Sequence, residues 1–257
     1  GGLGILALGP LSVEQARAAI IRVRELTDKP FGVNCALMMP TAKETAQVAL
    51  ELQVPVINFS LGKGDWLIKA CHGYGGKVIA TVTTAKHALA AQQQGADAVM
   101  VTGHEAAAHG GEVTSLVLIP AIVDTVKIPV IACGGFADQR GVLAALALGA
   151  EAVAMGSRFA TVQESPLHDN IKQNVIAKDQ HDTIFSPNFD GLPARYMKTP
   201  LAAKLTRKPM NFFLAAWQAL FAAIALKMPV WKVMAGLLVE PQKIRLLANF
   251  GAATPRL

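Results

Sequence analysis

Seven short apolar segments recur along the first 160 residues, and they constrain the fold more than any other feature. Each is rich in Val, Ile or Ala and lacks strict alternation, as expected of parallel strands buried on both faces. They span residues 4–8, 31–35, 54–60, 77–82, 98–103, 128–135 and 152–160. Helical segments lie between them. The pattern therefore predicts right-handed βαβ units and a parallel sheet.

The helical segments carry recognisable ends. Ser12 precedes the first of them, and Gln15 follows three residues later, which is the spacing of a capping box. This segment ends before Pro30. Further helices are predicted within residues 41–53, 64–75, 84–96 and 138–150. Two of these end on Gly-Ala, a pair typical of a helix C-cap before the next strand.

Seven strands are one fewer than a closed (β/α)8 barrel contains. The chain opens on "GGLGILALG" without an initiator Met, so we expect it to be part of a longer protein whose first barrel strand precedes this sequence. The alternative is an open doubly wound sheet, which favours a GxGxxG loop after its first strand. Here "GGLGIL" precedes the strand instead. The interpretation is a TIM (β/α)8 barrel with its first strand missing from this chain.

Beyond residue 180 the pattern changes, which divides the chain into a barrel core at 1–180 and a C-terminal segment at 181–257. The stretch "SPNFDGLPARYMKTP" (186–200) is punctuated by Pro and Gly and is predicted to be a loop. Residues 210–226, "MNFFLAAWQALFAAIAL", are shorter than the ~20 residues of a bilayer span. They predict a buried or interface helix, with membrane attachment as the lesser alternative. A second helix is predicted within 229–250, and a homodimer is plausible.

Composition excludes several classes. Apolar residues make up 52% and charged residues 16% of the chain, which excludes a disordered protein. The net charge is +6, but no run of five basic residues occurs, so nucleic-acid binding is not expected. Cys35, Cys71 and Cys133 are far apart and form no CxxC. This favours a reducing compartment, the cytoplasm, and disfavours a disulfide framework or a zinc site.

Two glycine loops follow the sixth and seventh strands. Gly134 and Gly135 follow the sixth, and Gly156 and Ser157 follow the apolar residues of the seventh. If one strand precedes the chain, these are the loops after barrel strands seven and eight, where barrels commonly bind phosphate. Glycines let backbone N–H groups approach a phosphate. A phosphate-bearing cofactor is predicted; the alternative is two ordinary strand-to-helix turns.

Asn34 follows the apolar residues of the second strand in "FGVNCAL". A side-chain amide both donates and accepts hydrogen bonds, which suits the edge of a heterocycle such as the pyrimidine ring of a flavin. The alternative is an asparagine that simply forms a turn.

The loop after the fifth strand, "GHEAAAHGGE", carries the most polar residues. His109 is the candidate general base, because a loop histidine titrates near neutral pH; the alternative is an ordinary loop histidine. His104 and Glu105 are weaker candidates, and we expect Glu105 to orient the loop rather than react. The histidines and carboxylates here lack the spacing of a metal site, so no metal is expected.

Four stretches together resemble the nitronate monooxygenases, formerly called 2-nitropropane dioxygenases, from residue 1 to about 180. They are "FGVNCAL", "GADAVMVTGHEAAAHGGE", "IPVIACGGFADQRGVLAALALGAEAVAMGSRF" and "ESPLH". The wider group includes FMN-dependent NADH:quinone reductases and an FMN-dependent enoyl-ACP reductase with similar motifs.

The resemblance implies a TIM barrel with non-covalent FMN. The residues it assigns to the FMN phosphate are Gly134, Gly135, Gly156 and Ser157. It places Asn34 and Met155 in contact with the cofactor, and Ala107 and Gly110 as backbone contacts near the ring. His109 matches the active-site histidine, as catalytic base or substrate-orienting group.

The sequence departs from the family's motifs at three places. These differences concern which subfamily the chain resembles, more than whether it binds FMN. The "QGGM"-type loop of the family's first strand is absent, and Ala108 stands where a glycine commonly precedes the histidine. The sequence reads "ATVTT" where some relatives have a lysine.

The resulting expectation is an FMN-dependent nitronate monooxygenase, which oxidises alkyl nitronates with O2 to carbonyl compounds and nitrite. An NAD(P)H-dependent reductase of a quinone or an enoyl thioester is the alternative enzyme. A non-catalytic protein that docks a partner or membrane through residues 212–226 is the alternative from another class.

Overall fold

A computed structural model describes residues 1–9, 11–39, 41–107, 109–188 and 192–208, with positions 211, 213, 216, 217 and 220. The chain divides into two compact units. The first comprises Gly1–Glu105 and Gly111–Met155, and the second comprises Ala106–Gly110 and Gly156–Leu257. The units are described separately below.

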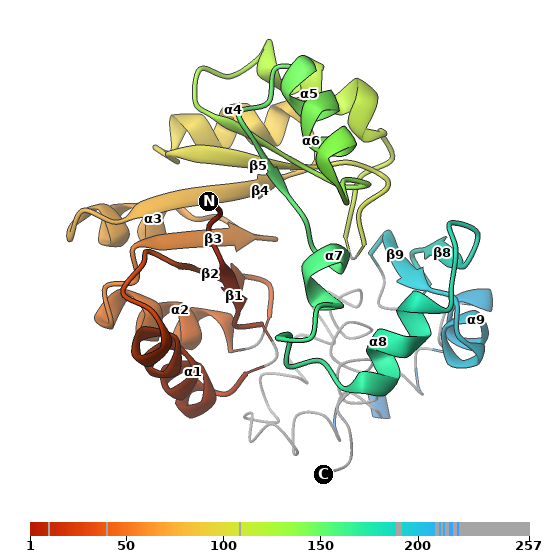
Figure 1. Ribbon diagram of the computed structural model, residues 1–257. Helices are drawn as coiled ribbons and strands as arrows, with labels where there is room; N and C mark the ends of the chain where they lie inside the picture. Colours follow the sequence, from red (N-terminus) through yellow and green to blue (C-terminus); the bar gives the residue numbers. More distant parts are fainter. Residues whose placement is uncertain are drawn as a thin grey trace. The chain divides into compact units, whose positions relative to one another are not determined.

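The first unit is built on seven parallel strands that pair in chain order (Figure 1). The strands are β1 (Ile5–Ala7), β2 (Gly32–Ala36), β3 (Val56–Ser60), β4 (Lys77–Val82), β5 (Ala98–Thr102), β6 (Val130–Cys133) and β7 (Ala152–Ala154). A doubly wound sheet reverses its strand order at a switch point. The unbroken order from β1 to β7 is that of a TIM barrel. The barrel prediction is confirmed, and the open-sheet alternative is wrong.

Six helices connect these strands: α1 (Val13–Leu26), α2 (Ala42–Glu51), α3 (Asp65–His72), α4 (Ala85–Gln93), α5 (Ser115–Val123) and α6 (Gln139–Ala147). The capping box that opens α1 is present as predicted. Ser12 Oγ accepts a hydrogen bond from Gln15 N at 3.3 Å, and Gln15 Oε1 accepts one from Ser12 N at 2.9 Å. Local sequence thus sets where this helix begins.

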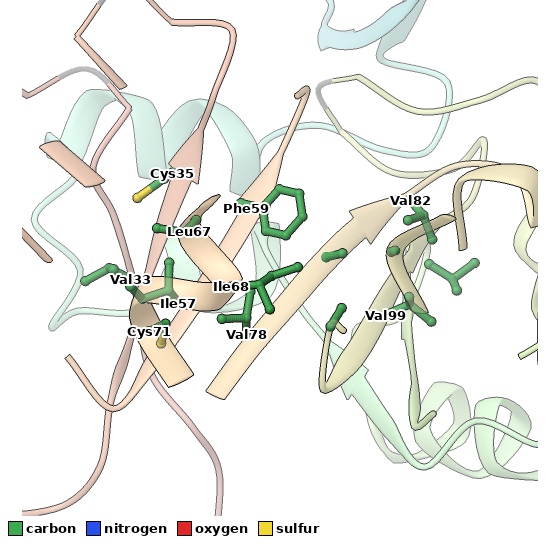
Figure 2. Close-up of a cluster of buried hydrophobic side chains, with 14 of the residues drawn as sticks. Val33, Cys35, Ile57, Phe59, Leu67, Ile68, Cys71, Val78, Val82 and Val99 are labelled. Atoms are coloured by element: carbon green, nitrogen blue, oxygen red, sulfur yellow. The ribbon is translucent and has the colours of Figure 1, made fainter. Parts of the chain in front are cut away.

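The two faces of the sheet differ in character, because successive residues of a strand point to opposite sides. One face packs against the helices and is apolar and largely buried; we call it the helix-covered face. Figure 2 shows part of it, with residues of β2, β3, β4 and α3 in contact: Val33, Cys35, Ile57, Phe59, Val78, Leu67, Ile68 and Cys71. Burial raises the pKa of the Cys35 thiol to about 12.

The opposite face, called the inner face below, is formed by the residues that alternate with these. It includes Asn34, Asn58, Thr81, Met100 and Cys133, as the strand registers show. Most of these side chains are only half-buried. The helix-covered face therefore supplies the hydrophobic core, and the inner face carries the polar groups.

The second unit contains α7 (Ser157–Ala160), α8 (Asp169–Ile176), the antiparallel pair β8 (Thr183–Ser186) and β9 (Ala194–Met197), and α9 (Pro200–Arg207). His168 caps α8, since its Nδ1 accepts a hydrogen bond from Asn170 N at 3.1 Å. Lys172 of α8 is buried, and its Nζ donates to the carbonyl oxygens of Gln163 and Ser165 at 3.1 and 2.7 Å. These bonds hold the segment that precedes the helix.

Two sequence expectations need correction here. The apolar run 152–160 is not one strand: β7 ends at Ala154, and residues from Ser157 form a helix. The stretch 186–200 is not a continuous loop, because β9 lies inside it and pairs with β8. Pro187 and Pro193 lie just outside the paired residues, where a missing N–H does not interrupt the ladder.

The helices predicted within 210–226 and 229–250 lie almost wholly outside the described residues. Among the helices that the structure does describe, none combines the length and the apolarity required to cross a membrane.

Candidate active site

The glycine pair after β6 has a conformation that other residues rarely adopt. Gly134 has a φ of 113° and Gly135 a φ of 81°. Both values lie in the region that glycine occupies without steric cost. Asp138 then begins α6, and its carboxylate accepts hydrogen bonds from Arg140 N at 3.0 Å and Gly141 N at 3.4 Å. The sequence "GGFAD" thus turns the chain sharply at the carboxyl end of β6 and exposes backbone rather than side chains.

Glu105 connects this turn to the start of α5 through hydrogen bonds with Ser115. Its Oε2 accepts hydrogen bonds from Ser115 N at 2.8 Å and Ser115 Oγ at 2.9 Å. Ser115 Oγ also lies 2.9 Å from the carbonyl oxygen of Gly134. The N-cap residue of α5, Thr114, makes no capping bond with its own side chain. Glu105 therefore caps α5 from within the loop that precedes this helix, as expected of a residue that orients this region.

Gly103 makes that arrangement possible. A Cβ atom at this position would lie 2.1 Å from Ser115 Oγ and 2.7 Å from Ser115 N. Only a residue without a side chain lets the end of β5 approach the start of α5 so closely. Sequence reasoning did not single out Gly103; the signal was a glycine directly after an apolar strand and before polar residues.

The histidine loop is divided between the two units. His104 belongs to the first unit; its backbone N donates to Val113 O at 2.9 Å, and its Nδ1 lies 3.1 Å from Gly111 O. The segment Ala106–Gly110, with His109, belongs to the second unit. Ala107, His109 and Gly110 are described, and His109 is half-buried. Their assignment to the flavin ring stays a prediction.

Asn34 lies in the middle of β2, not after its end. The expectation of an amide that follows the strand is wrong, because β2 continues past this polar residue to Ala36. The side chain of Asn34 is half-buried on the inner face, and its Nδ2 donates a hydrogen bond to Asn58 Oδ1. Its contact with a flavin stays a prediction.

Asn58 of β3 is the centre of a network that sequence reasoning missed. It is only 3% exposed, and its Nδ2 donates to Ile79 O and Thr81 Oγ1, both at 3.0 Å. The signal was present: a carboxamide inside the apolar run 54–60, at the position that pairs with Asn34. A buried amide is costly unless its hydrogen bonds are satisfied.

The remaining predicted residues, Met155, Gly156 and Ser157, follow β7, and Cys133 of β6 was not predicted as a site residue. Cys133 ends β6; burial raises the pKa of its thiol, and a hydrogen bond with Thr102 lowers it in part. Met155 is the last residue of the first unit, directly after β7. Gly156 and Ser157 continue the chain into α7. A Cβ atom at Gly156 would meet nothing within 4 Å.

Residues 1–219 match the profile of the nitronate monooxygenase family. The chain is 42% identical over 205 residues to (3aS,4S,5R,7aS)-5-hydroxy-7a-methyl-1-oxo-octahydro-1H-indene-4-carboxyl-CoA dehydrogenase of Rhodococcus jostii, over 80% of this chain and 58% of that protein. The chain thus spans less than two thirds of that relative. It is 32% identical over 241 residues to a probable nitronate monooxygenase of Staphylococcus aureus, over 76% of this chain and 68% of that protein.

Two solved structures are similar over nearly the whole chain. FabK from Thermotoga maritima is 36% identical with a TM-score of 0.79, over 95% of this chain and 86% of FabK. Nitroalkane oxidase from Streptomyces ansochromogenes is 25% identical with a TM-score of 0.74, over 97% of this chain and 84% of that one. Together with the profile match over residues 1–219, these similarities show that the chain belongs to the nitronate monooxygenase family.

Proposed function

We propose that this chain is the FMN-binding part of an oxidoreductase that oxidises alkyl nitronates with O2, giving a carbonyl compound and nitrite. The observation that carries the proposal is the pair Gly134–Gly135, held at the carboxyl end of β6 by Glu105 and Ser115. This is the edge of a barrel sheet at which phosphate groups of cofactors bind.

The residues present fit the phosphate of FMN. A Cβ at Gly135 would lie 3.3 Å from Glu105 Cβ, a tight contact, and the φ of 81° disfavours any side chain there. Without a side chain at this position, the backbone N–H groups of the turn are not shielded by one. Backbone N–H groups in such a turn bind anions. We assign Gly134 and Gly135 to the phosphate, with Gly156 and Ser157 as the second phosphate-binding segment and Met155 as a neighbouring contact.

The other assignments concern the ring and the substrate. Asn34 contacts the pyrimidine edge of the flavin, and the backbone of Ala107 and Gly110 lies near the ring. FMN, when bound, accepts electrons from the substrate, and the protein supplies placement and electrostatics. His109 holds the oxygens of a nitronate, or removes the proton from the carbon beside the nitro group of a neutral nitroalkane.

A second candidate function has its own support. Identity is 42% to the carboxyl-CoA dehydrogenase and 36% to FabK, against 32% to the probable nitronate monooxygenase. These figures favour an acyl thioester as substrate, with NAD(P)H as the electron donor of an FMN-dependent reductase. The same glycine turn would bind FMN in either case, so the two functions differ in the substrate and not in the cofactor.

Visible spectra of the intact protein distinguish the two functions. We would record them without oxygen, before and after adding an alkyl nitronate, and separately after adding NADH or NADPH. Flavin bands that change on adding nitronate support the monooxygenase. Flavin bands that ignore nitronate and bleach with a nicotinamide support the reductase. A purified protein that binds no FMN, even when FMN is added, contradicts both.

A further inference from the structure

Three neighbouring strands are joined across the inner face by one buried side chain. Asn58 of β3 accepts a hydrogen bond from Asn34 of β2 and donates to Ile79 O and Thr81 Oγ1 of β4. Asn34, Asn58 and Ile79 are direct partners in the strand register. The network therefore follows from how the sheet pairs, and not from a flexible loop.

The orientation of both amides follows from one backbone group. A carbonyl oxygen only accepts hydrogen bonds, so the atom of Asn58 that faces Ile79 O must be the nitrogen. The oxygen of Asn58 then faces Asn34. An amide oxygen also only accepts, so Asn34 must turn its nitrogen toward Asn58. The chemistry of the contacts alone thus assigns nitrogen and oxygen in both side chains.

Asn34 is left with a defined hydrogen-bonding pattern. One N–H of its Nδ2 is used by Asn58, which leaves the other N–H and the acceptor Oδ1. Among the described residues, no hydrogen bond to Asn34 Oδ1 is found, and the side chain is only half-buried. The inner face therefore presents an acceptor beside a donor at a fixed position.

We infer that Asn58 is a positioning residue that fixes Asn34 as a hydrogen-bond acceptor for an imide N–H, with the free N–H of Asn34 directed to an adjacent carbonyl. The pyrimidine ring of a flavin has such an edge. The inference rests on the proposed FMN site and adds Asn58, with Thr81 behind it, to the residues that set cofactor affinity. Neither residue touches the cofactor.

A purely structural role does not explain why position 58 holds an amide rather than an apolar side chain. The strand residues on either side of it, Ile57 and Phe59, are apolar and buried on the helix-covered face. An apolar side chain of the same size would fill position 58 without the cost of burying an amide. An apolar residue would not, however, fix the orientation of the Asn34 amide and so leave its oxygen available to a ligand on the inner face.

A double-mutant cycle tests this directly, with the FMN dissociation constant as the measured quantity. The variants are Asn58→Leu, Asn34→Ala and the double variant, in the intact protein. If Asn58 acts through Asn34, each single change weakens FMN binding by about five- to tenfold, and Asn58→Leu adds less than twofold when Asn34 is already Ala. Thr45→Val is the matched control, since Thr45 is buried in α2 and its hydroxyl donates to Ala42 O, its sole hydrogen bond within the described part of the chain.

A second measurement reads the network without cofactor. In apo-protein, the side-chain amide protons of Asn34 should give two separated NMR signals, one of them slow to exchange with water. Asn58→Leu should make both protons exchange fast, whereas Thr45→Val should leave the slow signal unchanged.

The outcomes separate the two proposals. Wild-type protein that binds FMN, with fully multiplicative effects in the cycle or unchanged Asn34 signals in Asn58→Leu, overturns the role of Asn58 and leaves the proposed function standing. Wild-type protein that binds no FMN overturns the proposed function and, with it, this inference.

Discussion

The carboxylate of Glu105 and the backbone N–H of Ser115 are 2.8 Å apart, and this contact caps a helix with a residue ten positions earlier in the chain. It links the ends of β5 and β6 through the start of α5, because Ser115 Oγ also reaches Gly134 O. The turn that we propose to bind phosphate is thus held in place by a carboxylate. This carboxylate is itself negatively charged and does not bind the anion.

Removing this carboxylate should loosen the turn. We expect Glu105→Ala to lower the free energy of unfolding by about 1 kcal/mol, as for loss of a helix cap, and the melting midpoint by about 2–4 °C. FMN binding should weaken as well. Glu112→Ala is the control, because Glu112 is an exposed carboxylate of the same connection. Equal melting midpoints for the two variants would show that the cap contributes nothing.

Two glycine-to-alanine changes should affect different properties, one the stability of the fold and the other FMN binding. Gly103→Ala places a methyl group 2.1 Å from Ser115 Oγ, so we expect loss of folded protein or a destabilisation above about 3 kcal/mol. Gly156→Ala meets no atom within 4 Å and should leave the melting midpoint unchanged. If Gly156 lies against the FMN phosphate, the same change should weaken FMN binding at least fivefold. Calorimetric melting and FMN titration of both variants check this contrast; a Gly103→Ala protein that melts normally contradicts the observed packing.

His109→Asn tests the proposed base. The variant should bind FMN within about twofold of wild type and lose about 10²- to 10⁴-fold of its turnover on a neutral nitroalkane, since proton removal contributes that much. Turnover of a preformed nitronate should fall less. Steady-state nitrite release measures both. His87→Asn, an exposed histidine of α4, is the control. Loss of flavin from His109→Asn would instead identify a structural histidine.

Stability below pH 4 should depend on Asp97. Its carboxylate accepts hydrogen bonds from His72 Nε2, Lys77 Nζ and Val78 N at 2.7–2.8 Å. Burial alone would raise the pKa of Asp97, but these bonds outweigh burial and hold the pKa below its ordinary value of 3.8. The stabilisation is therefore complete above about pH 4 and is lost as the pH falls through the lowered pKa.

Asp97→Asn should remove most of that dependence. We expect its melting midpoint to be lower than that of wild type at pH 7 and the difference to shrink between pH 4 and pH 2. Melting curves at half-unit steps measure this. Asp124→Asn, at an exposed aspartate that ends α5, should run parallel to wild type. A constant gap between Asp97→Asn and wild type across the acid range would contradict the prediction.

The sequence was sufficient for the barrel because its signals are local and repeated. Each of the seven apolar runs coincides with an observed strand, although β2 extends one residue beyond its run, and Ser12 with Gln15 begins α1 as expected. The errors arose where the end of a strand or the start of a helix had to be placed within a continuous apolar run. Ala152 and Phe159 belong to one apolar run, yet a short helix starts at Ser157. The pairing of β8 with β9 is a contact between separate segments, which turn-forming residues alone do not reveal.

The site was less predictable, since its geometry depends on strand register. Glycines at strand ends were enough to find Gly134 and Gly135. Asn58 was missed because its meaning comes from lying opposite Asn34, and that pairing appears only when β2 and β3 are aligned.

The contrast between the two faces of the sheet has a consequence for protein engineering. The helix-covered face supplies most of the hydrophobic core, whereas inner-face residues such as Ala36, Ser60, Met100 and Ile131 are half-buried in this chain. Saturation libraries at these four positions should retain mostly soluble variants. Selection for new substrates could therefore begin there, without first stabilising the scaffold.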